Sequence, residues 1–148
     1  MSPWSLRLTK AVLPDDFARR RRQLLNHMHP GSIAVIPGAV QHRRNNDIFF
    51  PFRQDSDFYY LTGFREPDAL LVLIPGRKQG ETIVFCRERD PLLERRDGVI
   101  LGPEGCQSAL GVDDAFPIGD VDEILPGLLE ARSQVYMNLG EHAAWDER

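Results

Sequence analysis

Apolar residues recur along the chain in a helical rhythm in two places. The first is Pro14 to Met28, where Phe17, Leu24, Leu25 and Met28 fall at i, i+7, i+8 and i+11 and form one stripe. We predict a helix there, beginning at Pro14 and ending before His29-Pro30-Gly31. Arg19 to Arg22 lie between the apolar positions and are expected to face mostly outward.

The second helical rhythm runs from Asp120 to Arg132, with apolar residues at i, i+3, i+4, i+7 and i+8. It predicts the clearest amphipathic helix of the chain. Asp120 is expected to cap it, and Glu123 three residues later completes a variant of the capping box. Pro126 interrupts the pattern, so we expect a kink or a break there.

Short continuous apolar runs predict buried strands at Ile33 to Ile36 and at Ala69 to Ile74. A third run, Thr82 to Cys86, should pair with the second as an antiparallel hairpin, and Gln134 to Met137 is expected to be a last strand. Between them, Gln41 to Asp47 is polar without a period and predicts a loop.

Glycine and proline punctuate the stretch from Pro91 to Gly111, which predicts short helical turns. Strands that alternate with helices, together with one hairpin, indicate an α/β fold: a mixed β-sheet flanked by helices.

The stretch PFRQDSDFYYLTGF, from Pro51 to Phe64, combines aromatic and charged residues in an unusual way. Asp55, Ser56 and Asp57 are residue types that cap helix N-termini, and Gly63 suits the left-handed position after a helix. The stretch therefore predicts a capped two-turn helix whose aromatic residues plug the core. Its aromatic content also allows a strand, and periodicity leaves that alternative open.

Composition narrows the function classes. The chain has 148 residues, enough for one domain with a real core, and its net charge of −4 argues against a nucleic-acid-binding protein. Arginines cluster at Arg19 to Arg22, at Arg43 with Arg44 and at Arg95 with Arg96, which predicts solvated surface or, alternatively, a phosphate-binding patch.

The two cysteines form no CxxC motif, so a reducing cytoplasm is expected. No apolar run is long enough for a bilayer or a signal peptide, so no membrane partner is expected.

Motifs that carry chemistry are missing from the sequence. It contains no HExxH, EF-hand, Walker, GxGxxG or GxSxG pattern, and its four histidines have no spacing typical of a metal site. We therefore expect no catalytic residue, no metal ligand and no cofactor in this chain. The ending EHAAWDER has the composition of a new helix without the length, as expected for a domain cut from a longer protein.

The stretch PFRQDSDFYYLTGF, followed by REPDALLVLIPG, resembles the N-terminal domain of bacterial aminopeptidase P, a family that also holds prolidase and creatinase. Further matching stretches occur in the same order: FARRRRQLL, NND, RERD, LGPEG and LGVDDAF. The resemblance covers roughly residues 14 to 145. It divides the chain into an N-terminal extension, 1–13, and a domain, 14–148.

The resemblance implies a fold of the ribonuclease H-like kind and a second, C-terminal catalytic domain that this chain lacks. In the family that domain holds two metal ions, usually manganese, on two Asp, one His and two Glu. This chain is then expected to be a non-catalytic domain, inactive alone, that shapes the substrate cleft and supports oligomerisation. Its expected partners are its own C-terminal domain, a peptide with proline at the second position, and further copies of itself.

Two positions carry substrate-binding roles by resemblance. Asp47, in the NND stretch, corresponds to an Asp that reaches toward the substrate, where a carboxylate would bind the peptide's free amino group. Without the resemblance, Asp47 would be a loop residue making a local turn bond. Arg96 stands where the family has a Trp that closes over the active site of a neighbouring subunit. Val99 and Ile100 stand where the family has arginines, so the chain departs from the pattern there.

Three alternatives remain. These departures leave room for a catalytically degenerate paralogue that binds peptides without metal. A prolidase- or creatinase-type hydrolase is a second alternative. A regulator that uses the arginine clusters on nucleic acid is a third, and it predicts binding that weakens steeply with salt.

Overall fold

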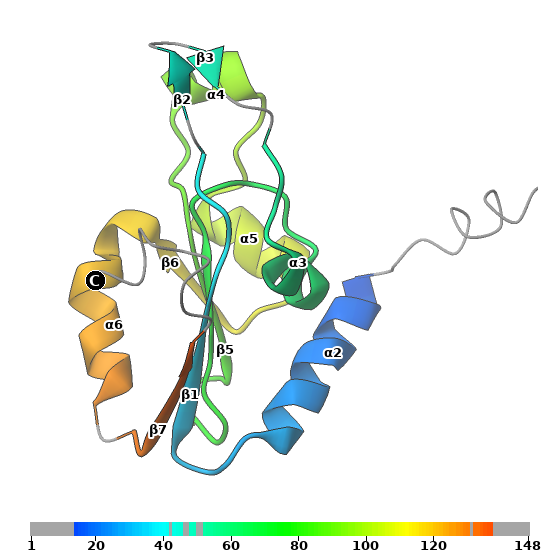
Figure 1. Ribbon diagram of the computed structural model, residues 1–148, viewed down its shortest axis with the longest axis vertical. Helices are drawn as coiled ribbons and strands as arrows, with labels where there is room; N and C mark the ends of the chain where they lie inside the picture. The colour runs from blue at the N-terminus through cyan, green and yellow to red at the C-terminus, as the bar shows by residue number, and fades with distance from the viewer. Residues whose placement is uncertain (1–13, 42, 46–47, 50–51, 131, 138–148) are drawn as a thin grey trace, which may run out of the picture.

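A five-stranded sheet forms the centre of the computed structural model, which describes residues 14–41, 43–45, 48–49, 52–130 and 132–137 (Figure 1). The strand order is β6-β5-β4-β1-β7. β4 pairs antiparallel with both β1 and β5, whereas β6 and β7 join the two edges in parallel. The predicted mixed sheet is therefore confirmed. The strands are β1 (Ser32–Pro37), β4 (Leu70–Leu73), β5 (Thr82–Cys86), β6 (Asp114–Pro117) and β7 (Gln134–Met137).

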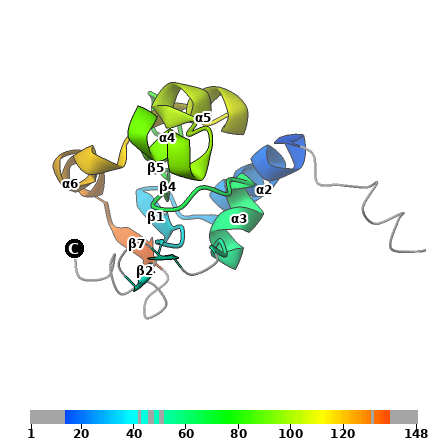
Figure 2. The ribbon, with the colours of Figure 1, turned by 90° about the horizontal axis from the view of Figure 1, so that it is seen from above.

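Helices cover the sheet on both faces, as Figures 1 and 2 show. One face carries α2 (Pro14–His27), α3 (Ser56–Thr62) and α5 (Gly102–Leu110). The other carries α6 (Val121–Leu129), which follows a 3-10 turn, η1 (Ile118–Asp120). Alternate residues of β4 point to the two faces: Leu71 belongs to the core beneath the first group of helices and Leu70 to the core beneath α6. All four residues of β4 are buried, as its continuous apolar run predicts.

The aromatic stretch forms the helix α3, which settles the alternative that its sequence left open. The side chain of Asp55 accepts a hydrogen bond from the backbone N–H of Phe58 at 2.9 Å, as an N-cap residue does. Gly63 follows the helix with φ +68°, and a Cβ atom there would collide with the ring of Phe17. Phe58 is fully buried, but Tyr60 is 54% exposed, so the aromatic residues plug the core only in part.

Arg21 is the exception among the arginines of α2, which were expected to face mostly outward. Its side chain is 2% exposed, and its guanidinium donates hydrogen bonds to the carbonyl oxygens of Leu61 at 2.8 Å and Leu110 at 2.6 Å. Both carbonyls lie in the last turn of a helix, where intrahelical donors are missing. Burial lowers the pKa of Arg21, and the nearby carboxylate of Asp113 acts in the opposite direction.

Three short strands were not predicted from the sequence. Arg43–Asn45 forms β2, which pairs antiparallel with β3 (Ile48–Phe49), where a loop was expected. β6 was not predicted at all, because its four residues have no alternation. Pairing with β5 creates β6, and the Asp113 carboxylate before it accepts hydrogen bonds from the backbone N–H groups of Glu81 and Thr82 at 2.9 and 3.1 Å.

The beginning of α6 also differs from its prediction. Among the described residues, the side chain of Asp120 makes no capping hydrogen bond, so the predicted capping box is wrong. The physical reason is that η1 holds Asp120 at φ −93° and ψ 3°, outside the extended conformation that an N-cap residue needs. The helix runs through Pro126 to Leu129 instead of breaking there. Pro126 has no backbone N–H to donate within the helix, and Asp122, four residues before it, is exposed.

Candidate functional site: the α4 arm

Residues 87–101 leave the sheet after β5 and return at α5; we call this segment the α4 arm. It contains the helix α4 (Pro91–Asp97) and lies at the end of the molecule where β2 and β3 also lie (Figure 1). The view from above places α4 over the β5 side of the sheet and β2 over the β7 side (Figure 2). The structure describes every residue of α4, and none of them is buried.

Local sequence explains why a helix forms on so exposed a segment. The side chain of Asp90 accepts a hydrogen bond from the N–H of Leu92 at 2.9 Å, and Pro91 follows as the first helical residue. At the other end Gly98 takes φ +85°, and its N–H donates to the carbonyl of Glu94 at 3.0 Å. Caps at both ends therefore define α4 without an apolar face.

Three charged side chains tie the arm to the body of the domain. Arg87 lies between two carboxylates: one guanidinium nitrogen contacts Glu66 at 3.3 Å and the other contacts Asp97 at 3.3 Å. The second oxygen of Glu66 accepts the backbone N–H of Leu101 at 3.1 Å. The buried Nε atom of Arg87 has no hydrogen-bond partner within the described part of the chain. This Glu66–Arg87–Asp97 network holds both ends of the arm at its base.

Two further hydrogen bonds, both accepted by Glu94, join the two chain segments of the arm. Arg89 Nε donates to Glu94 at 2.9 Å, and the same carboxylate oxygen accepts the backbone N–H of Ile100 at 3.2 Å. These two contacts, the hydrogen bond from Arg89 first, hold the pKa of Glu94 below its ordinary value of 4.5. The carboxylate therefore stays charged and joins the two chain segments of the arm.

Arg96, a predicted substrate-binding residue, lies on the exposed surface of α4. Its Nε atom donates to Asp97 at 3.2 Å, and its side chain is 47% exposed. The two other positions that the resemblance led us to expect as departures have opposite surroundings: Val99 is 78% exposed, whereas Ile100 is 1% exposed. An arginine at position 100 would need a different arrangement of the arm, because a buried charge is costly without a partner.

Asp47, the other predicted substrate-binding residue, lies outside the residues that the structure describes. The strands before and after it, β2 and β3, pair antiparallel at the same end of the molecule as α4 (Figure 1). The structure therefore gives no geometry for a pair of Asp47 and Arg96.

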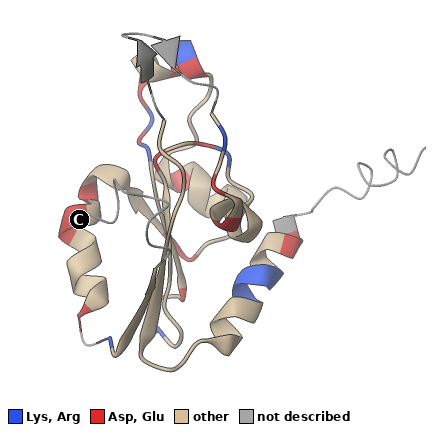
Figure 3. Cartoon of the chain, in the orientation of Figure 1, with Lys and Arg blue, Asp and Glu red and all other residues tan. Residues whose placement is uncertain are grey.

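The α4 arm offers charged side chains that can bind a partner. Both signs of charge occur along α4 and the segments leading to it (Figure 3). No group of three or more His, Cys, Asp or Glu side chains that could hold a metal ion occurs in ranges 14–41, 43–45, 48–49, 52–130 and 132–137. In the same ranges no helix has the length and apolar character to cross a bilayer. The arm can present a guanidinium to an anionic or aromatic partner.

Sequence reasoning did not find Glu66 and Arg87. The two residues are 21 positions apart, and neither belongs to a periodic pattern or a motif of known chemistry. One signal was available: RERD is a dense run of charge directly after a buried strand, as expected where a chain leaves the core. The partner of Arg87 could be known only from the folded chain.

Known proteins resemble this chain over almost all of its described length. The sequence pattern of the aminopeptidase P N-terminal domain family matches residues 17–136. A Xaa-Pro aminopeptidase of Haemophilus influenzae is 41% identical over 127 residues, which are 85% of this chain and 30% of that protein.

Solved structures agree with the sequence comparison. Pseudomonas aeruginosa aminopeptidase PepP has a TM-score of 0.88 and 52% identity, over 93% of this chain and 31% of that one. Escherichia coli aminopeptidase P with the inhibitor Pro-Leu has a TM-score of 0.86 and 39% identity, over 92% of this chain and 31% of that one. The chain thus spans about 30% of the length of the relatives that it matches.

Proposed function

The chain belongs to the family of aminopeptidase P N-terminal domains, and from this premise we propose that it serves as the non-catalytic domain of a Xaa-Pro aminopeptidase. The parent enzyme would release the N-terminal residue of a peptide whose second residue is proline. This domain would shape the substrate cleft and support a homo-oligomer. The observation that carries the proposal is the family match over residues 17–136, combined with similarity to a peptidase of which the matched residues are 30%.

The reaction itself would belong to a C-terminal domain outside this chain. Two manganese ions are expected there, and bound metal supplies an activated water for attack on a peptide carbonyl. Free, buried thiols at Cys86 and Cys106 suit a reducing cytoplasm, where we place the parent protein.

Asp47 and Arg96 are the residues of this chain that we propose to reach the substrate. A carboxylate at position 47 would pair with the free amino group of the peptide, since charge-assisted hydrogen bonds orient a substrate well. Arg96 would act across the oligomer, on the active site of a neighbouring subunit. Its support is its position on an exposed helix that a network of ion pairs holds away from the sheet.

A direct experiment separates the chain from its parent. The chain is incubated with Mn²⁺ and an Xaa-Pro-Yaa tripeptide, and the free N-terminal amino acid is measured; none is expected above the blank. The full-length protein, assayed in parallel, should release it. Turnover by the purified chain itself would overturn the assignment of a non-catalytic role. A full-length protein without activity would overturn the assignment of a Xaa-Pro aminopeptidase as its parent.

The role of Arg96 is tested in the full-length protein by Arg96→Trp, with Arg95→Trp as the matched control on the same exposed helix. An aromatic ring in place of a guanidinium should change the relative kcat/KM of peptides with apolar and acidic side chains by a factor of about five, or about 1 kcal/mol. The Arg95→Trp enzyme should keep the parental ranking. Equal rankings in all three proteins would remove Arg96 from the substrate site.

The departures at Arg96, Val99 and Ile100 favour one second candidate, a degenerate paralogue that binds peptides without cleaving them. The two candidates differ in the sequence that follows this domain. Intact metal ligands there make the parent an enzyme, and substituted ligands make it a binding protein.

A further inference from the structure

The half-buried side chain of Gln54 makes four hydrogen bonds, which we call the Gln54 clamp. Its Oε1 atom accepts the backbone N–H groups of Ala39 at 2.8 Å and of Asp55 at 3.0 Å. Its Nε2 atom donates to the carbonyl oxygens of Phe64 at 3.1 Å and of Glu66 at 2.8 Å. Only an amide fits these surroundings, because a carboxylate can only accept and a guanidinium can only donate.

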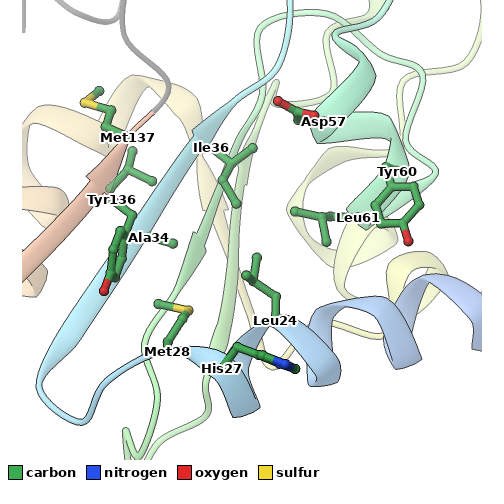
Figure 4. Close-up of a pocket in the computed structure, with 11 residues that line it drawn as sticks. Leu24, His27, Met28, Ala34, Ile36, Asp57, Tyr60, Leu61, Tyr136 and Met137 are labelled. Carbon is green, nitrogen blue, oxygen red and sulfur yellow. The ribbon is translucent and has the colours of Figure 1, made fainter.

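The chain around the Gln54 clamp is held in place by α3 and β1. Leu61 of α3 and Ile36 of β1 face the same pocket between these two elements (Figure 4), and both pack in one core cluster. Directly after β1, a Cβ atom on Gly38 would lie 3.1 Å from Gln54 Oε1 and 3.3 Å from the ring of Phe58. The amide therefore occupies a closely packed position at the end of β1.

One side of the Gln54 clamp closes the base of the β2–β3 strand pair. The chain leaves β1 and passes Ala39 before it forms β2, and after β3 it reaches Gln54. The hydrogen bond between Ala39 and Gln54 therefore joins the outgoing and the returning chain. The carbonyl of Ala39 also accepts the N–H of Asp68 at 3.0 Å, so the outgoing chain is fixed on the domain by a second contact.

The other side of the Gln54 clamp holds the base of the α4 arm through Glu66. The carbonyl of Glu66 accepts from Gln54, while its carboxylate contacts Arg87 at 3.3 Å. The same carboxylate accepts the backbone N–H of Leu101 at 3.1 Å. Arg87 and Leu101 are the first and last residues of the arm. Since β2, β3 and α4 lie at the same end of the molecule (Figure 1), one amide joins the bases of both segments.

We propose that Gln54 is a positioning residue, which fixes the β2–β3 strand pair relative to the α4 arm and thereby aligns the two segments toward the substrate. Its role in fixing the segments rests on the four hydrogen bonds alone. Its effect on the substrate rests on the proposed function, in which Asp47, between β2 and β3 in the sequence, and Arg96, on α4, reach the peptide.

Two variants of the full-length protein separate the halves of the Gln54 clamp, and residue-resolved amide hydrogen exchange measures each half. Gln54→Met removes all four hydrogen bonds, so exchange at Ala39 and in α4 should become about threefold to tenfold faster. Gln54→Glu, at a pH where its carboxylate is charged, still accepts from Ala39 and Asp55 but cannot donate to Phe64 and Glu66. Exchange in α4 should then become faster while Ala39 stays protected.

Gln107→Glu is the matched control for the exchange experiment. Gln107 also donates to a backbone carbonyl, that of Asp113 at 2.8 Å, but it lies on α5. This variant should leave exchange at Ala39 and in α4 unchanged. The proposal is overturned if Gln54→Glu leaves α4 unchanged, or if Gln107→Glu accelerates α4 equally. If circular dichroism shows that Gln54→Met does not fold, Gln54→Glu decides the outcome.

Steady-state kinetics of the full-length protein test the effect on the substrate. With an Xaa-Pro-Yaa tripeptide, Gln54→Glu should raise KM by about threefold to tenfold and change kcat by less than about twofold, because the proposed reaction centre lies in another domain. An unchanged KM together with faster exchange in α4 would overturn the alignment toward the substrate. A parental full-length protein without activity would overturn the proposed function, whereas exchange in α4 would still decide whether Gln54 positions the arm.

Discussion

In β4 all four residues are buried, whereas in α4 none of the seven residues is, and both elements are described completely. The sheet owes its position to apolar side chains that pack on both faces. The α4 arm owes its position to two helix caps and to contacts between arginines and carboxylates. Because α4 buries no residue and the Arg89–Glu94 and Arg96–Asp97 pairs lie at the surface, where ion pairs stabilise little, the arm adds little to the stability of the domain.

The core and the arm also differ in how each of them uses an arginine. Arg21 is buried and joins the ends of α3 and α5, whereas Arg96 is exposed on α4. A change at position 21 disturbs the packing of two helices. A change at position 96 alters only what the arm presents to a partner. A surface residue of the arm such as Val99, which is 78% exposed, can therefore change while the fold stays the same.

Among the changes that test the contrast between sheet and arm, Phe58→Ala is expected to cause the largest loss of stability. Phe58 is fully buried in the core beneath α2 and α3, so its removal should lower the free energy of unfolding by about 3–5 kcal/mol. Leu92→Ala on the arm, where Leu92 is 73% exposed, should change it by less than about 0.5 kcal/mol. Urea denaturation measures both, and similar losses would contradict the contrast between sheet and arm.

Arg21→Met should have the next largest effect. It leaves the carbonyls of Leu61 and Leu110 without their donor, which should lower the free energy of unfolding by about 2–3 kcal/mol. Arg19→Met is the matched control on the same helix, because Arg19 is 65% exposed and pairs only at the surface with Asp16. It should cost less than about 0.5 kcal/mol. A control as damaging as Arg21→Met would show that the buried hydrogen bonds are not the cause.

Arg87→Met should separate the arm from the sheet. The loss of the Glu66–Arg87–Asp97 network should cost about 1 kcal/mol or less in global unfolding, partly because the Nε atom of Arg87 lacks a partner among the described residues. Amide hydrogen exchange should accelerate in α4 and stay unchanged in β4. Arg77→Met, which breaks a similarly covered pair with Asp114 in the sheet region, should leave exchange in α4 unchanged.

The smallest effect is a pH dependence of the arm. The folded pKa of Glu94 lies below its ordinary value of 4.5. The charged Glu94 carboxylate therefore stabilises the arm fully above pH 4.5, and this stabilisation is lost as the pH falls through the folded pKa. Amide hydrogen exchange in α4, corrected for intrinsic rates, should become faster below about pH 4.5. In Glu94→Gln this increase in the exchange rate should be absent. An increment that survives in Glu94→Gln belongs to another carboxylate.

The sequence by itself predicted those elements in which local chemistry and burial agree. The apolar runs of β1, β4, β5 and β7 are strands, and the apolar stripe of α2 is a helix. For α3, the caps Asp55 and Gly63 favoured a helix, and the structure confirms it. A motif match likewise indicated the family, which the comparisons show.

Tertiary structure alone decided the features that depend on residues distant in the chain. Arg21 looks like any exposed arginine of a helix until two helix ends, 40 and 89 residues away, supply carbonyls to its guanidinium. β6 exists because β5 offers it an edge, and Arg87 finds Glu66 because the chain returns to the same corner of the sheet. Periodicity records which side of an element faces the core, but not which partner fills the space opposite, since that partner is set by how the whole chain packs.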